Sequence, residues 1–364
     1  MTLSTETDVN KFLISIELPE VHQKLGDVGR ISGLETSETR ISAQIELGFP
    51  AECAFENISA HIGTAVREKT GVDDVDIQLS TSIVAHGVQR NLKPLENVRN
   101  VIAVASGKGG VGKSTVAVNL ALSLVADGAS VGMLDADIYG PSQPHMLGIA
   151  GAQPVSQDGK SMAPLEAHGL QVMSIGFLVD PDQPMVWRGP MVTSALSQLL
   201  HQTEWRDLDY MIVDMPPGTG DIQLTLSQQV PVSGAVIVTT PQDIAAIDAR
   251  KGLTMFRKVS IPVLGVIENM STHVCSSCGF EESIFGAGGG DRMAEDFDIA
   301  VLGQLPLEAK IREQTDAGNP TVVSDPDSAA ADAYRAAARR MTARLAVQGR
   351  DYSSKFPKIV VEES

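Results

Sequence analysis

One short segment limits what this chain can fold into more than any other feature of the sequence. An apolar stretch at residues 101–105 leads into a glycine-rich run made of Gly107, Lys108, Gly109, Gly110, Val111, Gly112, Lys113, Ser114 and Thr115. The run fits the pattern G-x-x-x-x-G-K-S/T and lies between a predicted strand and a predicted helix. Glycines allow backbone N–H groups to close around phosphate oxygens, and the helix start adds a positive end. We therefore predict a nucleotide site in which Lys113 reaches the phosphates and the Ser114 hydroxyl binds Mg²⁺.

The rest of this region predicts the fold around the loop. Short apolar runs alternate with helical segments at 101–105, 130–134, 170–175, 210–213, 235–239, 263–267 and 300–305. Continuous apolar strands separated by helices indicate a parallel sheet that is covered on both faces. We expect an α/β fold with a mostly parallel, doubly wound sheet over residues 99–350. Its last helix lies at about 327–348, with Tyr334, Ala338, Met341 and Leu345 on the apolar face, and a tail follows at 351–364.

The N-terminal part has a different pattern. Helical spacing of apolar residues near residues 9–16 and 55–66 flanks two alternating stretches at 41–47 and 75–79. Residues 86–98 lose this periodicity and contain a proline. The sequence therefore predicts a small α/β domain at 1–85 and a linker at 86–98.

Acidic side chains follow two of the predicted strands of the larger domain. The second strand runs into Asp135, Ala136 and Asp137, and the strand at 210–213 ends at Asp214. Mg²⁺ prefers hard oxygen ligands, and ligands of parallel sheets bind at the carboxyl ends of strands. An aspartate at a strand end is also a common helix cap or turn former, so each acid alone leaves both interpretations open.

The chain has three cysteines, too few for a disulfide framework, and two of them form a C-x-x-C pair at Cys275 and Cys278. Such a pair is half of a zinc knuckle, a redox dithiol, half of an iron–sulfur site, or two structural loop cysteines. A tetrahedral zinc or a four-iron cluster takes four ligands, which one chain cannot supply as thiolates. Two cysteines from each protomer across a twofold axis would complete the set, so ligand counting favours a site in a dimer.

The charge excludes some partners. There are 28 lysines and arginines against 45 aspartates and glutamates, a net charge of −17. Nucleic acids and acidic membranes are polyanions, so we expect no affinity for either. Residues 1–20 lack the basic start and apolar run of a signal peptide, and no stretch reaches the roughly 20 apolar residues that cross a bilayer. We therefore expect a cytoplasmic protein.

The glycine-rich loop with its early lysine, Lys108, resembles the deviant Walker A loop of P-loop NTPases. That loop marks the dimeric ATPases that include the cell-division regulator MinD, the partition ATPases and the nitrogenase iron protein. The resemblance implies catalytic roles for Lys108, which crosses to the partner's ATP, for Lys113, and for Asp137, a switch I carboxylate that orients the attacking water. It implies that Ser114, Asp137 and Asp214 bind Mg²⁺ directly or through water, with Asp214 ending a Walker B strand. Asn269 matches the purine-contacting asparagine of the family.

The cysteine pair narrows this resemblance. Together with the motifs at 137–142 and 214–221, it is similar to the Mrp/ApbC/Nbp35 group of iron–sulfur cluster carriers over residues 98–345. The resemblance implies a homodimer with ATP, Mg²⁺ and a [4Fe–4S] cluster that is bridged by Cys275 and Cys278 of both protomers. The cluster would come from an upstream scaffold and pass to apo iron–sulfur proteins, with slow ATP hydrolysis. The N-terminal domain resembles the MIP18-like (DUF59) domain, where Cys53 is either a cluster-handling thiol or a buried apolar residue.

Other interpretations of the same motifs lead to different proteins. A spatial-organising ATPase like MinD or the partition proteins would bind membrane or DNA, and the arginines of the helix at 327–348 could form a DNA patch. The simpler interpretation is that this arginine face is solvated, and neither relative explains the cysteine pair. A redox ATPase of the nitrogenase iron-protein type takes ligands that lie far apart in sequence, unlike Cys275 and Cys278. A zinc-bridged scaffold also stays open.

Overall fold

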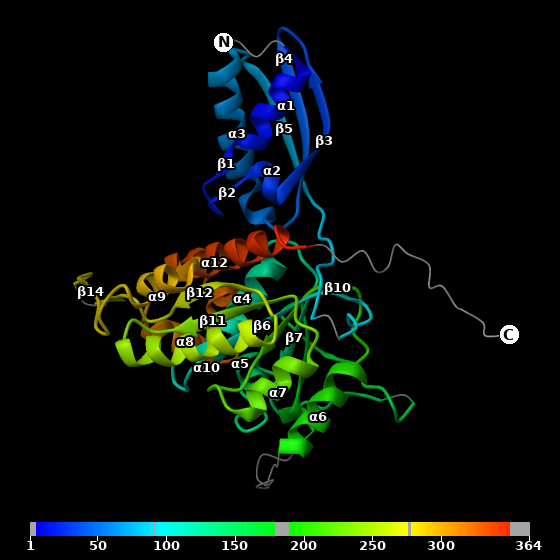
Figure 1. Cartoon of the computed structure of the whole chain (residues 1–364), viewed down its shortest axis with the longest axis vertical. Coiled ribbons are helices and arrows are strands. Elements are labelled where there is room, and N and C mark those ends of the chain that lie inside the picture. The colour runs from blue at the N-terminus through cyan, green and yellow to red at the C-terminus, as the bar shows by residue number, and fades with distance from the viewer. Residues whose placement is uncertain (1–4, 90–91, 157, 179–188, 276–277, 350–364) are drawn as a thin grey trace, which may run out of the picture.

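The computed structural model describes residues 5–89, 92–156, 158–178, 189–275 and 278–349, which form two packed units (Figure 1). The predicted tail at 351–364 lies outside the described residues. Within the part of the chain that is described, no helix combines the length and hydropathy that crossing a bilayer requires.

The N-terminal unit is a three-stranded sheet with helices on one face. Its elements are α1 (Glu6–Ser15), β1 (Glu17–Leu18), β2 (Gln23–Lys24), α2 (Leu25–Val28), β3 (Gly29–Thr36), β4 (Arg40–Leu47), the 3₁₀ turn η1 (Glu52–Ala54), α3 (Phe55–Thr70) and β5 (Asp74–Thr81). β4 is the central strand, antiparallel to β3 and parallel to β5. Its alternate residues Ile41, Ala43, Ile45 and Leu47 are buried, as the alternation in the sequence predicts.

The larger unit contains the predicted parallel sheet. Its strands are β6 (Val98–Ser106), β7 (Val131–Asp135), β8 (Leu165–Ala167), β9 (Leu170–Ser174), β10 (Leu208–Asp214), β11 (Gly234–Thr239), β12 (Val263–Glu268) and β15 (Val301–Gln304), with the hairpin β13 (His273–Val274) and β14 (Glu281–Glu282) outside the sheet. Its helices are α4 (Lys113–Ala126), α5 (Gln143–Met146), α6 (Gly189–His201), α7 (Asp221–Gln229), α8 (Asp243–Lys258), α9 (Gly289–Phe297), α10 (Ala309–Asp316), α11 (Thr321–Ser324) and α12 (Ala329–Ala346), with a 3₁₀ turn η2 (Ile175–Phe177).

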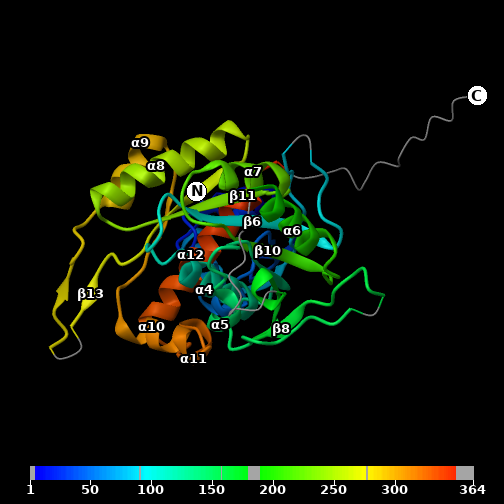
Figure 2. The same ribbon diagram turned by 90° about the horizontal axis from the view of Figure 1, so that it is seen from below.

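The order of the strands brings the functional segments together at the carboxyl ends of the central strands. The order is β15-β12-β11-β6-β10-β7-β9-β8, and each pair is parallel except β8 with β9. The seven predicted strands are all present, and β8 is the one sheet strand that the sequence patterns missed. Figure 2 shows α7 and α8 on one side of β6, β10 and β11, with α4 and α12 on the other. This confirms the predicted doubly wound α/β fold.

Helix α12 packs against both units. Its predicted apolar face is buried, and Ala343 from the same helix belongs to the core of the N-terminal unit. The expectation of a solvated arginine face is wrong for Arg339, whose side chain is 12% exposed. Its guanidinium donates to both carboxylate oxygens of Asp127 at 2.7 and 2.8 Å. Arg340 donates to backbone carbonyls of both units. These arginines bind within the protein, which weakens the DNA-patch interpretation.

Cys53 lies where the two units meet. Its backbone N–H donates to Asp127 at 3.1 Å, and its thiol donates to the carbonyl of Ala126 at 3.1 Å, at the end of α4. Cys53 is exposed, so the alternative of a buried apolar cysteine is wrong. A role in cluster handling stays a prediction.

The first residues of the predicted linker are hydrogen-bonded to the larger unit. The amide of Gln89 donates to the carbonyls of Ser227 and Val230 and accepts from the N–H of Val232 at 3.0 Å. The backbone N–H of His86 donates to the side chain of Asn100 at 3.1 Å. The start of 86–98 therefore contacts the sheet domain, and the last residue of this segment, Val98, is the first residue of β6.

Candidate functional site

A pocket of about 300 Å³ opens at the carboxyl ends of the central strands. It is lined by Ser106, Lys108, Gly109, Gly110, Gly112, Lys113, Ser114, Thr115, Asp137, Gly140, Ser142, Met146 and Pro217. The structure therefore brings the glycine-rich loop and the segment after β7 together, although they are separated by the whole of α4. The pocket holds most of the predicted nucleotide-binding residues.

The two other predicted loop residues lie behind the pocket and support its wall. A Cβ on Gly107 would lie 2.1 Å from the carbonyl carbon of Asp248, so only glycine lets α8 approach the loop this closely. Val111 is buried, and its carbonyl accepts a hydrogen bond from the amide of Asn269 at 2.9 Å. Gly112 has φ +78° and caps the start of α4, where a Cβ would lie 2.3 Å from the same amide nitrogen. The loop is thus held in shape from behind by α8 and Asn269.

Asn269 comes from the end of β12, and its own N–H donates to the carbonyl of Thr239 at 2.8 Å. The side chain is 5% exposed and is used to hold the loop. The purine contact that the resemblance implies stays a prediction.

Lys113 is the buried cation of the site. Its side chain is 6% exposed, and the ammonium group forms an ion pair with Asp214, which is fully buried at the end of β10. The same ammonium donates to the Ser114 hydroxyl at 3.2 Å. Because a buried charge is stable only with partners, the phosphates of a nucleotide must compete with Asp214 for this lysine.

The carboxylates of Asp135 and Asp214 come from neighbouring strands at matching register positions. Burial raises the pKa of Asp135 to about 7, and the negative charge of Asp214 adds to the effect. Asp135 accepts hydrogen bonds from the backbone N–H groups of Asp137, Ser142 and Gln143 at 3.0–3.2 Å. Asp135 therefore fixes the shape of the segment that carries Asp137 to the pocket.

Asp137 is half-buried in the pocket wall. Burial raises the pKa of its carboxyl group above the usual range, while the positive charge of Lys113 acts in the opposite direction. A carboxyl group in this position can accept a proton or a hydrogen bond from a water molecule at the phosphates.

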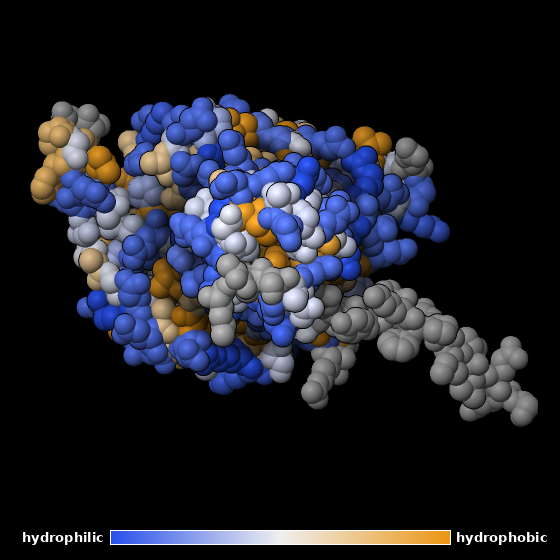
Figure 3. All heavy atoms as spheres, turned by 90° about the horizontal axis from the view of Figure 1, so that it is seen from above, coloured by the Kyte–Doolittle hydropathy of each residue, from blue (hydrophilic) through white to orange (hydrophobic). Residues whose placement is uncertain are grey.

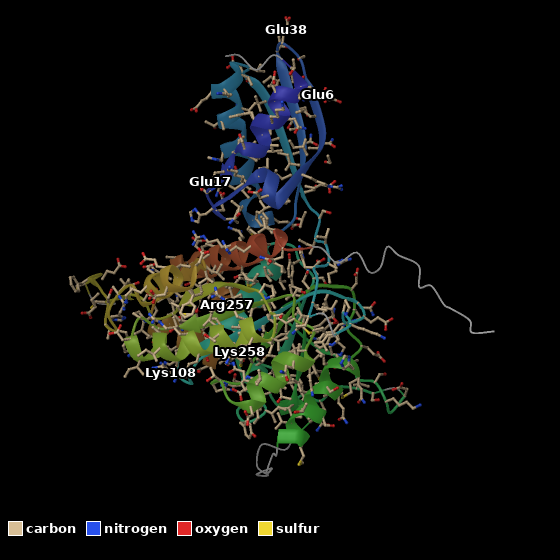
Figure 4. All side chains as sticks on the ribbon, viewed as in Figure 1. Glu6, Glu17, Glu38, Lys108, Arg257 and Lys258 are labelled. Carbon is tan, nitrogen blue, oxygen red and sulfur yellow. The ribbon has the colours of Figure 1, made fainter. Side chains whose placement is uncertain are left out.

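Lys108 lies at the mouth of the pocket. Figure 4 places it on the side of the sheet unit that faces away from the N-terminal unit, where Glu6, Glu17 and Glu38 are labelled. Lys108 makes no ion pair within the part of the chain that the structure describes. Its ammonium is therefore available to a phosphate or to a second molecule.

The predicted cysteine ligands are on a separate hairpin. β13 and β14 pair in antiparallel fashion, and this hairpin projects beyond α9 at the edge of the domain (Figures 1 and 2). Cys275 donates its N–H to the carbonyl of Phe280 at 2.9 Å, and Gly279 donates to the carbonyl of Cys275 at 2.9 Å. Cys278 is exposed and Cys275 is partly exposed. These bonds close the loop and bring the two cysteines to its tip.

Exposed apolar side chains surround the cysteine loop. Val274, Phe280 and Ile284 are 42%, 63% and 52% exposed. Figure 3 shows hydrophobic side chains gathered on this projecting tip. No group of three or more His, Cys, Asp or Glu residues with metal-binding geometry occurs among the described residues, so the cysteine loop offers two thiols and requires further ligands from elsewhere.

Three residues of the site have no assigned role in the sequence patterns. Asp135 stands two residues before Asp137 and shares its strand end, which is a usable signal for a buried carboxylate. Ser142 lines the pocket, and its buried hydroxyl has no hydrogen-bond partner among the described residues. Gln143 is fully buried beside Asp214, and no feature of the sequence indicates this position.

The donor set fits a magnesium nucleotide. Ser114, Asp137 and Ser142 place hard oxygen groups in the pocket, and the Ser142 hydroxyl has no hydrogen-bond partner among the described residues. Asp214 does not line the pocket: it is fully buried behind Lys113, so it reaches a bound Mg²⁺ only after Lys113 moves away. A Cβ on Gly109 or Gly110 would meet no atom within 4 Å, so the loop backbone faces open space in which phosphate oxygens can lie.

Comparison with known proteins identifies the family. The model of the NUBPL iron-transfer P-loop NTPase family matches residues 97–342. The chain belongs to this family. Its membership confirms the resemblance that the phosphate loop and the cysteine pair predict, while the assignment of the N-terminal unit as MIP18-like stays a prediction.

Similar proteins include several carriers. The chain is 48% identical over 349 residues to the iron-sulfur cluster carrier protein of Haemophilus influenzae, covering 96% of this chain and 94% of that protein. It is 53% identical over 270 residues to the iron-sulfur cluster transfer protein NUBPL of Mus musculus, covering 74% and 84%. A solved nucleotide-binding protein of Archaeoglobus fulgidus in complex with ADP matches with a TM-score of 0.56 and 35% identity, covering 64% of this chain and 90% of that one.

Proposed function

We propose that this NUBPL-family chain is an ATP-dependent iron–sulfur cluster carrier that works as a homodimer. The observation that carries the proposal is the pairing of a buried phosphate-loop site with two accessible cysteines on a projecting hairpin. The similarity to carrier and transfer proteins supports the same activity.

In the proposed reaction the glycine-rich loop holds the phosphates of ATP. Lys113 leaves Asp214 for the β- and γ-phosphates, where it stabilises the charge that develops during hydrolysis. Asp137 orients the water that attacks the γ-phosphorus, and ADP leaves with the bridging oxygen. Mg²⁺, when bound by Ser114 and the two acids, neutralises phosphate charge. Lys108 reaches the nucleotide of the second protomer, which makes the dimer depend on ATP.

The cargo is a [4Fe–4S] cluster held by Cys275 and Cys278 of both protomers. Two thiolates from each chain complete the four ligands, and the site lies at the surface. A cluster held there is exchanged by thiolates of an incoming apoprotein more easily than one buried within a single chain. The exposed apolar side chains around the loop provide contact area for the second protomer or for donor and recipient proteins.

Anaerobic reconstitution with iron and sulfide tests this proposal. We expect the wild-type protein to acquire a visible iron–sulfur absorption band with about two irons per chain, as expected when one four-iron cluster is shared by two chains. The Cys275→Ala/Cys278→Ala variant should load no cluster, whereas Cys53→Ala, the matched control, should load as the wild type does. Unchanged loading in the double variant would contradict the ligand assignment. Zinc without iron in anaerobically isolated protein would favour the zinc-bridged scaffold.

A further inference from the structure

The segment that carries Asp137 ends on a glutamine that contacts three parts of the nucleotide site. Gln143 is the first residue of α5 and is fully buried. Its amide nitrogen donates to Oδ2 of Asp214 at 2.8 Å and to the backbone carbonyl of Ser114 at 3.1 Å. Its backbone N–H donates to Asp135 at 3.1 Å. One residue therefore connects β7, the phosphate loop and β10.

The orientation of this amide follows from its neighbours. Both contacts of the amide end, Asp214 Oδ2 and the Ser114 carbonyl, are acceptors, so the NH₂ group must face them and the oxygen must point away. That oxygen is buried and has no hydrogen-bond partner among the described residues. An apolar side chain would fill the same space without this cost, so packing alone does not account for a glutamine here.

The contact to Asp214 matters most when nucleotide binds. Asp214 is fully buried, with Lys113 on Oδ1 and Gln143 on Oδ2. In the proposed function Lys113 turns to the phosphates, which removes the cation from Oδ1. The Gln143 amide then remains as the hydrogen-bond donor that holds this buried carboxylate in place.

We propose that Gln143 is a positioning residue that holds Asp214 for Mg²⁺ while Lys113 moves between Asp214 and the nucleotide. This inference rests on the proposed function, because it concerns the magnesium nucleotide of the same site. Gln143 touches neither substrate nor reacting atoms; it acts through Asp214 and through the backbone of Ser114.

The test compares nucleotide affinity with and without Mg²⁺. Gln143→Met keeps the length of the side chain and removes the amide. We expect the affinity for a fluorescent ATP analogue in Mg²⁺ to fall about tenfold, as for loss of a hydrogen bond to a charged group, and the affinity in excess EDTA to change little. Half-saturation by Mg²⁺ at fixed nucleotide should move to higher concentration by a similar factor.

Gln171→Met is the matched control. Gln171 lies in β9, and its amide also makes two backbone hydrogen bonds, to the carbonyl and N–H of Arg206 at 2.9 Å, away from the pocket. It should leave the dependence on Mg²⁺ unchanged. Equal dependence in Gln143→Met and the control would overturn the inference, and so would an equal loss with Mg²⁺ and with EDTA, which indicates a structural role. A wild-type protein without Mg²⁺-dependent ATP binding would instead overturn the proposed function, and this inference with it.

Discussion

The phosphate-loop site and the cysteine hairpin differ in how deeply their functional groups are buried. In the phosphate-loop site, Lys113, Asp135 and Asp214 are buried, and each has at least two partners in the protein. In the hairpin, two strands of two residues each flank Cys278, which is exposed, and Cys275, which is partly exposed. A site that must distinguish phosphate charge needs fixed, desolvated groups, whereas a site that gives its cargo away needs access.

This difference predicts how far the effect of a substitution spreads. Removing one partner from a buried charge network leaves another group unsatisfied, so both binding and stability suffer. Removing an exposed side chain leaves the surrounding packing unchanged, so only its own chemistry is lost.

The largest effect is expected for Lys113→Ala. The substitution removes the cation that reaches the phosphates and leaves Asp214 buried without its ion partner. We expect loss of ATP binding by more than about 100-fold, since several kcal/mol of charge stabilisation disappear, and a decrease in stability of about 3–5 kcal/mol. Isothermal titration with ATP and urea denaturation measure the two effects.

Lys310→Ala is the matched control for this experiment. Lys310 forms an ion pair with Asp325, but its side chain is 61% exposed. Solvent screens surface pairs of this kind, so ATP affinity and stability should stay close to wild type. Normal ATP affinity in Lys113→Ala would contradict the assignment of the phosphate loop.

A second comparison uses two glycines with nearly the same backbone. Gly112 has φ +78° and Gly279 has φ +71°. A Cβ at Gly279 meets no atom within 4 Å, whereas one at Gly112 lies 2.3 Å from the amide nitrogen of Asn269. Gly279→Ala should therefore cost about 1–2 kcal/mol from the backbone alone, and Gly112→Ala roughly 2–4 kcal/mol with loss of nucleotide binding. Equal unfolding free energies for the two variants would show that the close approach of the Asn269 amide to Gly112 does not affect stability.

The fold was largely predictable from the sequence, because parallel strands buried on both faces are continuous apolar runs. The seven predicted strands of the large sheet follow from this pattern. The apolar face of α12 follows from the helical spacing of its apolar residues. β8 was missed because an antiparallel edge strand of three residues has too few positions for a pattern. β3 was missed because its residues are half-exposed and include Gly33, so no clear alternation develops.

The site residues that belong to a sequence motif were predictable, whereas those placed only by the packing of distant segments were not. The glycine-rich loop and Asp137 line one pocket, as the motifs indicate. Gln143 is far from the loop in sequence, and its role depends on the register of β7 and β10, which places Asp135 beside Asp214. The interaction of Arg339 with Asp127 was also unpredictable, because it depends on how α12 crosses the end of α4.

A smaller effect is expected on the reactivity of the Cys53 thiol, which can be measured separately from the two hairpin cysteines. Although Cys53 is exposed, its contact with the end of α4 removes part of the water around the thiol, and this partial desolvation raises the pKa above its ordinary value. The negative charge of Asp127 adds to the effect. Because only the thiolate reacts, a raised pKa means slower alkylation at neutral pH and a midpoint at higher pH. In a Cys275→Ser/Cys278→Ser background, where Cys53 is the remaining cysteine, the iodoacetamide rate should reach its midpoint at higher pH in the folded protein than in urea. Coinciding midpoints would contradict the contact between Cys53 and the end of α4.

The smallest effect is expected for the stability and the ATP affinity of the Cys275→Ser/Cys278→Ser variant, measured without a cluster. The hairpin is bound to the domain through its base. There the His273 ring nitrogen lies 2.9 Å from the Leu307 carbonyl, and the Leu307 N–H donates to the Thr272 carbonyl at 2.7 Å. Neither substitution changes a residue in these contacts. We expect the unfolding free energy of the cluster-free protein to stay within about 0.5 kcal/mol of wild type, and its ATP affinity within about twofold. Both are measured on chelator-treated protein, with urea denaturation and ATP titration as for Lys113→Ala. A large loss of ATP affinity would mean that the hairpin and the phosphate loop form one energetic unit, so the separation of a rigid nucleotide site from an accessible cargo site would have to be abandoned.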